Sequence, residues 1–101
     1  MRNLGAISSA DSKAMFLKNG AGFISCVGTF NTASVSVQFE TSTRGTWQAF
    51  ADGAAKTSNF QYTVDTVGVP VNVRVNIDSG APTGTLQCDG GVDTDNANAN
   101  D

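Results

Sequence analysis

The chain of 101 residues has no histidine, and only 15% of its residues are charged. Histidine is the usual general base of hydrolases, and without it neither cysteine can be activated by an imidazole partner. The sequence also lacks a Gly-x-Ser-x-Gly motif and a glycine loop that could hold phosphate. Glu40 is the sole glutamate, and a glycosidase would need it to face an aspartate across a cleft. We therefore predict that the protein is not an enzyme.

The sequence is equally poor in metal ligands. Two cysteines without any histidine cannot supply the four ligands of a structural zinc site. Asp93 and Asp95 have the spacing of the first two ligands of a calcium loop, but Ala97 stands at the third position and no glutamate closes the loop. We predict no metal and no cofactor, and we interpret the acidic C-terminal segment as a solvated tail.

Basic clusters and long hydrophobic runs are absent as well. The formal net charge is −3, and the six basic residues are scattered singly: Arg2, Lys13, Lys18, Arg44, Lys56 and Arg74. Because no basic stripe is present to neutralise phosphates, we predict that the protein does not bind nucleic acid. No apolar run reaches the length of a signal peptide or a membrane span. We therefore expect no membrane partner and synthesis in the cytoplasm, with an already processed secreted domain as the alternative.

The sequence is rich instead in glycine, threonine, serine, asparagine and valine, a composition typical of short strands joined by turns. In residues 33–40, "ASVSVQFE", apolar side chains alternate with polar ones. This alternation predicts a strand with one buried apolar face and one solvent-exposed polar face. The same pattern recurs at 69–78, "VPVNVRVNID", at 58–65, "SNFQYTVD", and in the shorter "GTWQAF" at 45–50. The predicted core framework is the set of inward-facing residues Val35, Val37, Phe39, Trp47, Phe60, Tyr62, Val71, Val73, Val75 and Ile77.

The N-terminal third and the end of the chain give less regular signals. The stretch "GFISCVGTF" is rich in strand formers, but its alternation breaks around Phe23 and Ile24, as in a strand buried on both faces or at a bulge. The stretch "KAMFLKNGAG" fits either a short helix or a strand that turns at Asn19–Gly20, and we favour the strand. The stretch "GTLQCDG" predicts a last strand with Leu86 and Cys88 inward.

Turn signals recur at intervals of roughly ten residues, as in antiparallel sandwiches and barrels. The predicted turns lie at residues 43–45, 51–55, 66–68, 79–84 and 89–91. We predict one all-β domain, a small antiparallel β-sandwich, either jelly-roll or immunoglobulin-like, of about six to eight strands. Its expected boundaries are 1–14 for a flexible N-terminal arm, 15–90 for the sandwich and 91–101 for a disordered acidic tail.

The cysteines and the tryptophan each leave two interpretations open. Cys26 and Cys88 either form a disulfide between an early and a late strand or remain small buried thiols, which suits a reducing cytoplasm better. Together with Trp47 they follow the order of the immunoglobulin framework, but Leu86 stands where that framework has a tyrosine. Trp47 is either a core residue, which we favour, or a platform on which a sugar ring stacks.

The stretch "VGTFNTASVSVQFETSTRGTWQAFADG", followed by "NVRVNIDSGAPTGTLQC", resembles small β-sandwich proteins of tailed-bacteriophage virions, particularly capsid decoration (cement) and head-surface proteins. The resemblance covers about residues 22–88. Its matching segments are framework only: Gly28–Phe30, Ala33–Glu40, Gly45–Trp47 and Val71–Ile77. The chain departs from the pattern at Asn31–Thr32, where a glycine-rich turn is common, and in its two cysteines. The resemblance implies no catalytic residue.

By this resemblance the protein is expected to be a structural virion protein, made in the host cytoplasm and located on the capsid surface. It would bind many times over the outside of an icosahedral head as a homotrimer, with the major capsid protein and itself as partners. The N-terminal arm, residues 1–14, or an edge of the sandwich would touch the shell. Two alternatives are a saccharide- or host-binding module of a phage tail or fibre, acting through Trp47, and a secreted immunoglobulin-like adhesion domain.

Overall fold

A computed structural model describes residues 2–92, and Met1 and residues 93–101 lie outside the described part. Within residues 2–92 there is no helix, and the eight strands are β1 (Arg2–Ile7), β2 (Met15–Leu17), β3 (Ala21–Thr29), β4 (Ser34–Glu40), β5 (Trp47–Ala49), β6 (Phe60–Asp65), β7 (Val71–Ser79) and β8 (Thr83–Val92). All strand pairs are antiparallel, so the prediction of an all-β antiparallel fold is confirmed. The predicted acidic tail falls outside the described residues, except for its first two positions, which end β8.

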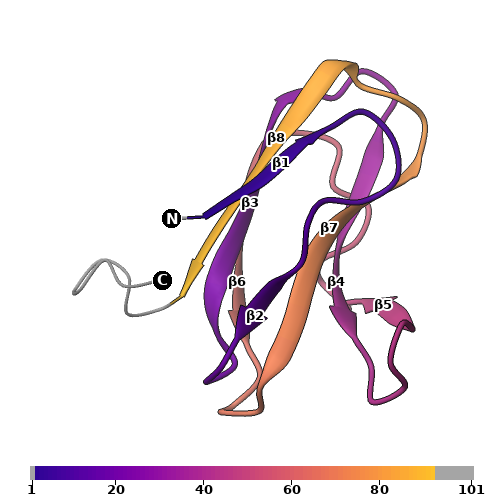
Figure 1. Cartoon of the computed structure of the whole chain (residues 1–101). Helices are drawn as coiled ribbons and strands as arrows, with labels where there is room; N and C mark the ends of the chain where they lie inside the picture. The colour runs from indigo at the N-terminus through magenta and orange to yellow at the C-terminus, as the bar shows by residue number, and fades with distance from the viewer. Residues whose placement is uncertain (1, 93–101) are drawn as a thin grey trace.

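The strands form two four-stranded sheets that pack face to face, in the orders β1-β8-β3-β6 and β2-β7-β4-β5 (Figure 1). Strand β1 pairs with β8, β2 with β7, β3 with β6 and β4 with β5. This is the pairing that results when one long antiparallel hairpin is rolled into a double sheet, and it defines the jelly roll. The topology therefore selects the jelly-roll alternative over the immunoglobulin-like one.

The core lies between the sheets and is built from the alternating residues of their inner faces. Val35 and Val37 from β4, with Val73 and Val75 from β7, have no exposed surface. The other buried apolar residues are Leu4, Ile7, Met15, Leu17, Ile24, Cys26, Phe30, Ala33, Val64, Val71, Leu86 and Cys88. Four further members of the predicted framework are partly buried and pack against this core: Phe39, Phe60, Tyr62 and Ile77.

Trp47 is not a core residue, and the prediction that placed it there is wrong. In the pairing of β4 with β5, Trp47 stands opposite Glu40, and Gln48 stands opposite Phe39. Directly opposed residues share a face of a sheet, so Trp47 lies on the outer face with Glu40. Its side chain is half-buried there against Arg74. Strand β5 has only three residues, and an alternation this short does not indicate which of its side chains point toward the core. That is decided by the register in which β5 pairs with β4.

The predicted N-terminal arm is also wrong for the described residues, because β1 is a paired strand. A register shift between Asn3 and Gly5 is a bulge in the pairing with β8, and it lets both Leu4 and Ile7 point inward. Their spacing of three residues hides the alternation that would otherwise have indicated a strand. The connection to β2 continues the packing, since Ser12 N–H donates to the carbonyl of Val75 at 2.8 Å.

Three local expectations change in the structure. The turn at Asn19–Gly20 exists, but β2 and β3 on its two sides belong to different sheets, so it is a corner between sheets and not a hairpin. Strand β3 alternates regularly through Phe23 and Ile24, and its register shift lies later, between Val27 and Thr29. Strand β8 runs without interruption through the turn expected at 89–91.

Candidate binding surfaces

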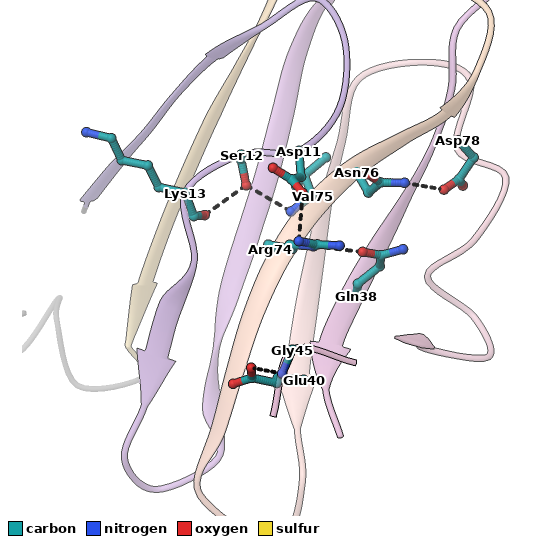
Figure 2. A network of polar contacts seen from close by, with 10 residues as sticks. All are labelled: Asp11, Ser12, Lys13, Gln38, Glu40, Gly45, Arg74, Val75, Asn76 and Asp78. Atoms are coloured by element: carbon teal, nitrogen blue, oxygen red, sulfur yellow. Dashed lines mark hydrogen bonds and ion pairs between the residues drawn. The ribbon is translucent and has the colours of Figure 1, made fainter. Parts of the chain in front are cut away.

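The outer face of the β2-β7-β4-β5 sheet gathers most of the polar side chains that sequence analysis placed on separate strands. We call it the polar face, and it consists of Phe16, Ser36, Gln38, Glu40, Trp47, Asn72, Arg74, Asn76 and Asp78, with Asp11 from the β1–β2 connection beside them. Figure 2 shows the ion pair between Asp11 and Arg74 and the hydrogen bonds from Arg74 to Gln38 and from Asn76 to Asp78.

Arg74 is the centre of the polar face. Its Nη1 lies 2.6 Å from Oδ2 of Asp11, and its Nε donates to Oε1 of Gln38 at 2.8 Å. The guanidinium carbon lies 4.2 Å from the centroid of the Trp47 ring, within range of a cation–π interaction. The half-buried guanidinium is therefore held by a carboxylate, an amide and an aromatic ring that come from three different segments.

Glu40 fixes the loop between β4 and β5. Its Oε2 accepts a hydrogen bond from Gly45 N–H at 2.8 Å, and its Oε1 accepts one from Nδ2 of Asn72 at 3.1 Å. These two donors, the Gly45 amide first, hold the pKa of the Glu40 carboxyl below its usual value. The carboxylate is thus ionised near neutral pH and positions the loop that leads into Trp47.

Ser36 is nearly fully buried although it belongs to the polar face. Its Oγ donates to Oδ1 of Asp78 at 3.0 Å, and Nδ2 of Asn76 donates to the same oxygen at 2.7 Å. The buried hydroxyl is therefore satisfied, as buried polar groups require. This end of the polar face is closed by internal contacts.

A second surface lies at the end of the sandwich where the β6–β7 turn meets the β4–β5 loop. We call it the apolar end. Val67 is 88% exposed and Val69 is 61% exposed, and Val69 borders a groove of about 520 Å³ together with Phe39, Glu40 and Pro70. Exposed apolar side chains gathered next to a groove and rimmed by polar residues mark a contact surface.

The β6–β7 turn holds its valine in an unfavourable backbone conformation. Val67 has φ 55° and Gly68 has φ 83°, and Val69 N–H donates to the carbonyl of Thr66 at 3.2 Å, which together define a type I′ turn. This turn prefers asparagine or glycine at the position of Val67, because a β-branched side chain crowds the backbone at positive φ. Asp65 Oδ1 accepts the Val67 N–H at 2.9 Å and helps to hold the strained residue.

The two cysteines face each other within one sheet. Cys26 on β3 pairs directly with Cys88 on β8, both are fully buried, and their sulfurs lie 3.9 Å apart as free thiols. The hydrogen bond between them lowers the pKa of Cys26 and raises that of Cys88. An immunoglobulin disulfide joins two sheets, so this pair inside one sheet is not its equivalent.

Tyr62 provides a measurable test of the packing at β6, because it is the only tyrosine. Burial, followed by the hydrogen bond from Tyr62 Oη to Oδ1 of Asp52, raises the pKa of Tyr62 to about 12. We expect an alkaline absorbance titration of the folded protein to give a phenolate midpoint near that value, above the usual value of about 10. Because the folded state keeps this proton longer, its stabilising effect is present below about pH 10 and is lost as pH rises from there through the folded pKa.

The matched variant in this titration is Asp52→Asn. It removes the carboxylate but keeps a hydrogen-bond acceptor, so the midpoint of Tyr62 should fall toward the ordinary value while the fold is unchanged. A midpoint at the ordinary value in the folded wild-type protein would contradict the burial and the contact described here.

Sequence analysis identified the strands of the polar face but missed its central residues. Arg74 is one of the scattered basic residues and Asp11 is not singled out in the sequence, since nothing local indicates that they meet. Val67 was assigned to a turn without notice of its conformation. No local signal indicated it, because a Val-Gly pair also fits a type II turn, in which the valine keeps negative φ.

Comparisons with known proteins return no relative for this chain: no family model, no curated protein and no solved structure matches it. Among residues 2–92, none belongs to a helix long and apolar enough to cross a membrane. In the same described part, no group of three or more histidine, cysteine, aspartate or glutamate side chains is placed to hold a metal ion. The fold and the two surfaces are therefore the basis for assigning a function.

Proposed function

We propose that this protein is a structural virion protein, a capsid decoration (cement) subunit that binds the outside of a tailed-bacteriophage head and stabilises it by contact. Two things support the proposal. The sequence of residues 22–88 resembles such proteins, and the jelly roll is an architecture that viral capsid domains use. The partners are the major capsid protein and further copies of this chain, in a homotrimer whose several small contacts act together.

The observation that carries the proposal is the apolar end. Val67 and Val69 leave most of their side-chain surface in water, next to the groove bordered by Phe39 and Pro70. We assign this end to the contact with the capsid shell. This contact replaces the N-terminal arm as the attachment point, because β1 is occupied in the sandwich.

The strain at Val67 supports the same assignment. Positive φ costs a β-branched residue about 1–2 kcal/mol, and an 88% exposed side chain recovers almost none of this in the isolated subunit. Burying the valine against a shell protein would recover about 1.5 kcal/mol of hydrophobic free energy. The residue is thus unfavourable for the subunit alone and favourable for a subunit that is bound.

The test uses heads purified without the protein. Wild-type protein added to them should cosediment with the heads and raise the temperature at which they release their contents. Val67→Asn suits the turn better, so this variant should raise the free energy of unfolding of the subunit by about 1 kcal/mol and yet bind heads more weakly.

Val27→Asn is the matched control, because Val27 is also an exposed valine (49% exposed) but lies on β3, on the outer face of the β1-β8-β3-β6 sheet. It should bind heads as the wild type does. The proposal fails if wild-type protein neither binds nor stabilises heads, and the assignment of the apolar end fails if Val67→Asn binds as tightly as the control.

A further inference from the structure

We propose that the polar face binds a neutral oligosaccharide along the row Phe16, Asn72, Glu40 and Trp47. This site runs over the face of the β2-β7-β4-β5 sheet and shares only Glu40 with the groove of the apolar end, and it does not depend on attachment to a capsid. The position of Trp47 suggested it, since the tryptophan lies on a polar outer surface and not in the core.

The four residues form one line across the sheet. Phe16 on β2 pairs with Asn72 on β7, Asn72 hydrogen-bonds to Glu40 on β4, and Glu40 pairs with Trp47 on β5. Neighbouring strands lie about 4.8 Å apart, so the two aromatic residues are separated by about 14 Å. The row therefore has an aromatic side chain at each end and polar groups between them, over the length of a short oligosaccharide.

The two aromatic residues are suited to stacking on sugar rings. The guanidinium of Arg74 lies over one face of the Trp47 ring and holds it in place, which reduces the entropy lost on binding, and a sugar ring would stack on the opposite face. No residue in the described range 2–92 accepts a hydrogen bond from the Trp47 indole N–H, which leaves this donor available to a ligand hydroxyl. Phe16 is 50% exposed on the opposite edge of the same face.

The polar groups between the aromatics are fixed and have spare hydrogen-bonding capacity. Glu40 is held by Gly45 and Asn72, yet each carboxylate oxygen can accept a further bond. The Asn72 amide oxygen and the Gln38 amide nitrogen have no described partner within residues 2–92. Sugar hydroxyls both donate and accept, so a row that offers carboxylate, amide and indole groups can satisfy several of them.

The charge of the polar face selects a neutral ligand. The carboxylates of Asp11, Glu40 and Asp78 outnumber the two guanidinium groups that act on Glu40, those of Arg44 and Arg74, and Arg74 is already paired with Asp11. Sialylated or phosphorylated glycans and nucleic acids would be repelled by this excess of negative charge. A polyol without ionised groups meets no such repulsion.

The wild-type protein can be tested directly, because Trp47 is the only tryptophan and its fluorescence reports on the site. The full chain is first applied to an array of immobilised neutral oligosaccharides, with sialylated glycans as the anionic comparison. The glycan that binds best is then titrated in solution. We expect it to change the Trp47 emission and to protect the ring against quenching by acrylamide.

Substitutions at the two ends of the row test whether the ligand binds along it. Trp47→Ala should weaken binding by about tenfold or more, and Phe16→Ala by a smaller factor. Val27→Ala, on the outer face of the other sheet, should leave the affinity unchanged. Circular dichroism and thermal unfolding establish that each variant is folded, and the quenching measurement on wild-type protein remains decisive if Trp47→Ala is not.

The inference is overturned if no neutral oligosaccharide binds, if binding leaves Trp47 emission and quenching unchanged, or if anionic glycans bind more tightly than neutral ones. None of these results bears on the capsid proposal, which is measured at the apolar end.

Discussion

Gly20→Ala is expected to lower the free energy of unfolding by about 3 kcal/mol. A Cβ at this position would lie 1.9 Å from Oγ1 of Thr66 and 2.4 Å from the carbonyl oxygen of Val69, and the residue has φ 70°. Gly20 is where the β2–β3 corner packs against the β6–β7 turn, and Thr66 N–H donates to the Gly20 carbonyl at 2.8 Å. Urea unfolding followed by fluorescence would measure the loss.

Gly68→Ala separates the cost of positive φ from the cost of the steric clash that the added Cβ makes at Gly20. Gly68 has φ 83°, but nothing lies within 4 Å of the Cβ that alanine would add. It should therefore show only the cost of positive φ, about 1 kcal/mol. Equal losses for the two variants would mean that the two turns are not packed as described.

Arg74→Met is expected to lower the free energy of unfolding by about 2 kcal/mol, because it removes three contacts and leaves Asp11 and Gln38 without their partner. Loss of the guanidinium also frees the Trp47 ring, so its emission should shift to the red. The ammonium of Arg74→Lys can restore the ion pair but not the planar contacts to Gln38 and Trp47, so it should recover only part of the loss.

Lys18→Met serves as the control for removing a positive charge, since Lys18 is exposed in the β2–β3 turn. Lys18→Met should change the free energy of unfolding by about 0.5 kcal/mol at most. If Arg74→Met unfolds at the same urea concentration as Lys18→Met, the polar network does not stabilise the fold, and its residues are held by the strands alone.

The elements that could be predicted from the sequence are those whose pattern is complete within one segment. Strands β4 and β7 alternate over enough residues for Val35, Val37, Val73 and Val75 to be assigned inward, and the β-branched type fits such positions. Periodicity also indicated the all-β class. It could not choose between jelly roll and immunoglobulin-like sandwich, because that choice lies in which distant strands pair.

What could not be predicted depends on contacts between segments. The face of Trp47 is set by its pairing with Glu40, and the alternation of β1 is broken by a bulge. The centre of the polar face joins Asp11, Gln38 and Arg74, which lie far apart in sequence. A single charged or amide residue on a strand carries no sign of the partner that the topology will bring to it.

The pairing of β1 with β8 also governs the order in which the molecule can fold. Strand β1 is synthesised before the other strands of the sandwich, but it pairs with β8, which is synthesised after them. Likewise, β2 cannot pair until β7 has been synthesised, and β3 cannot pair with β6 until β6 has been synthesised. Among the eight strands of residues 2–92, only β4 and β5 are consecutive in sequence and also paired with each other. Long-range pairings of this kind slow the search for the native state and leave strand edges open during synthesis. The nascent chain therefore depends on its final strand, and a polypeptide that stops before β8 has no partner for β1.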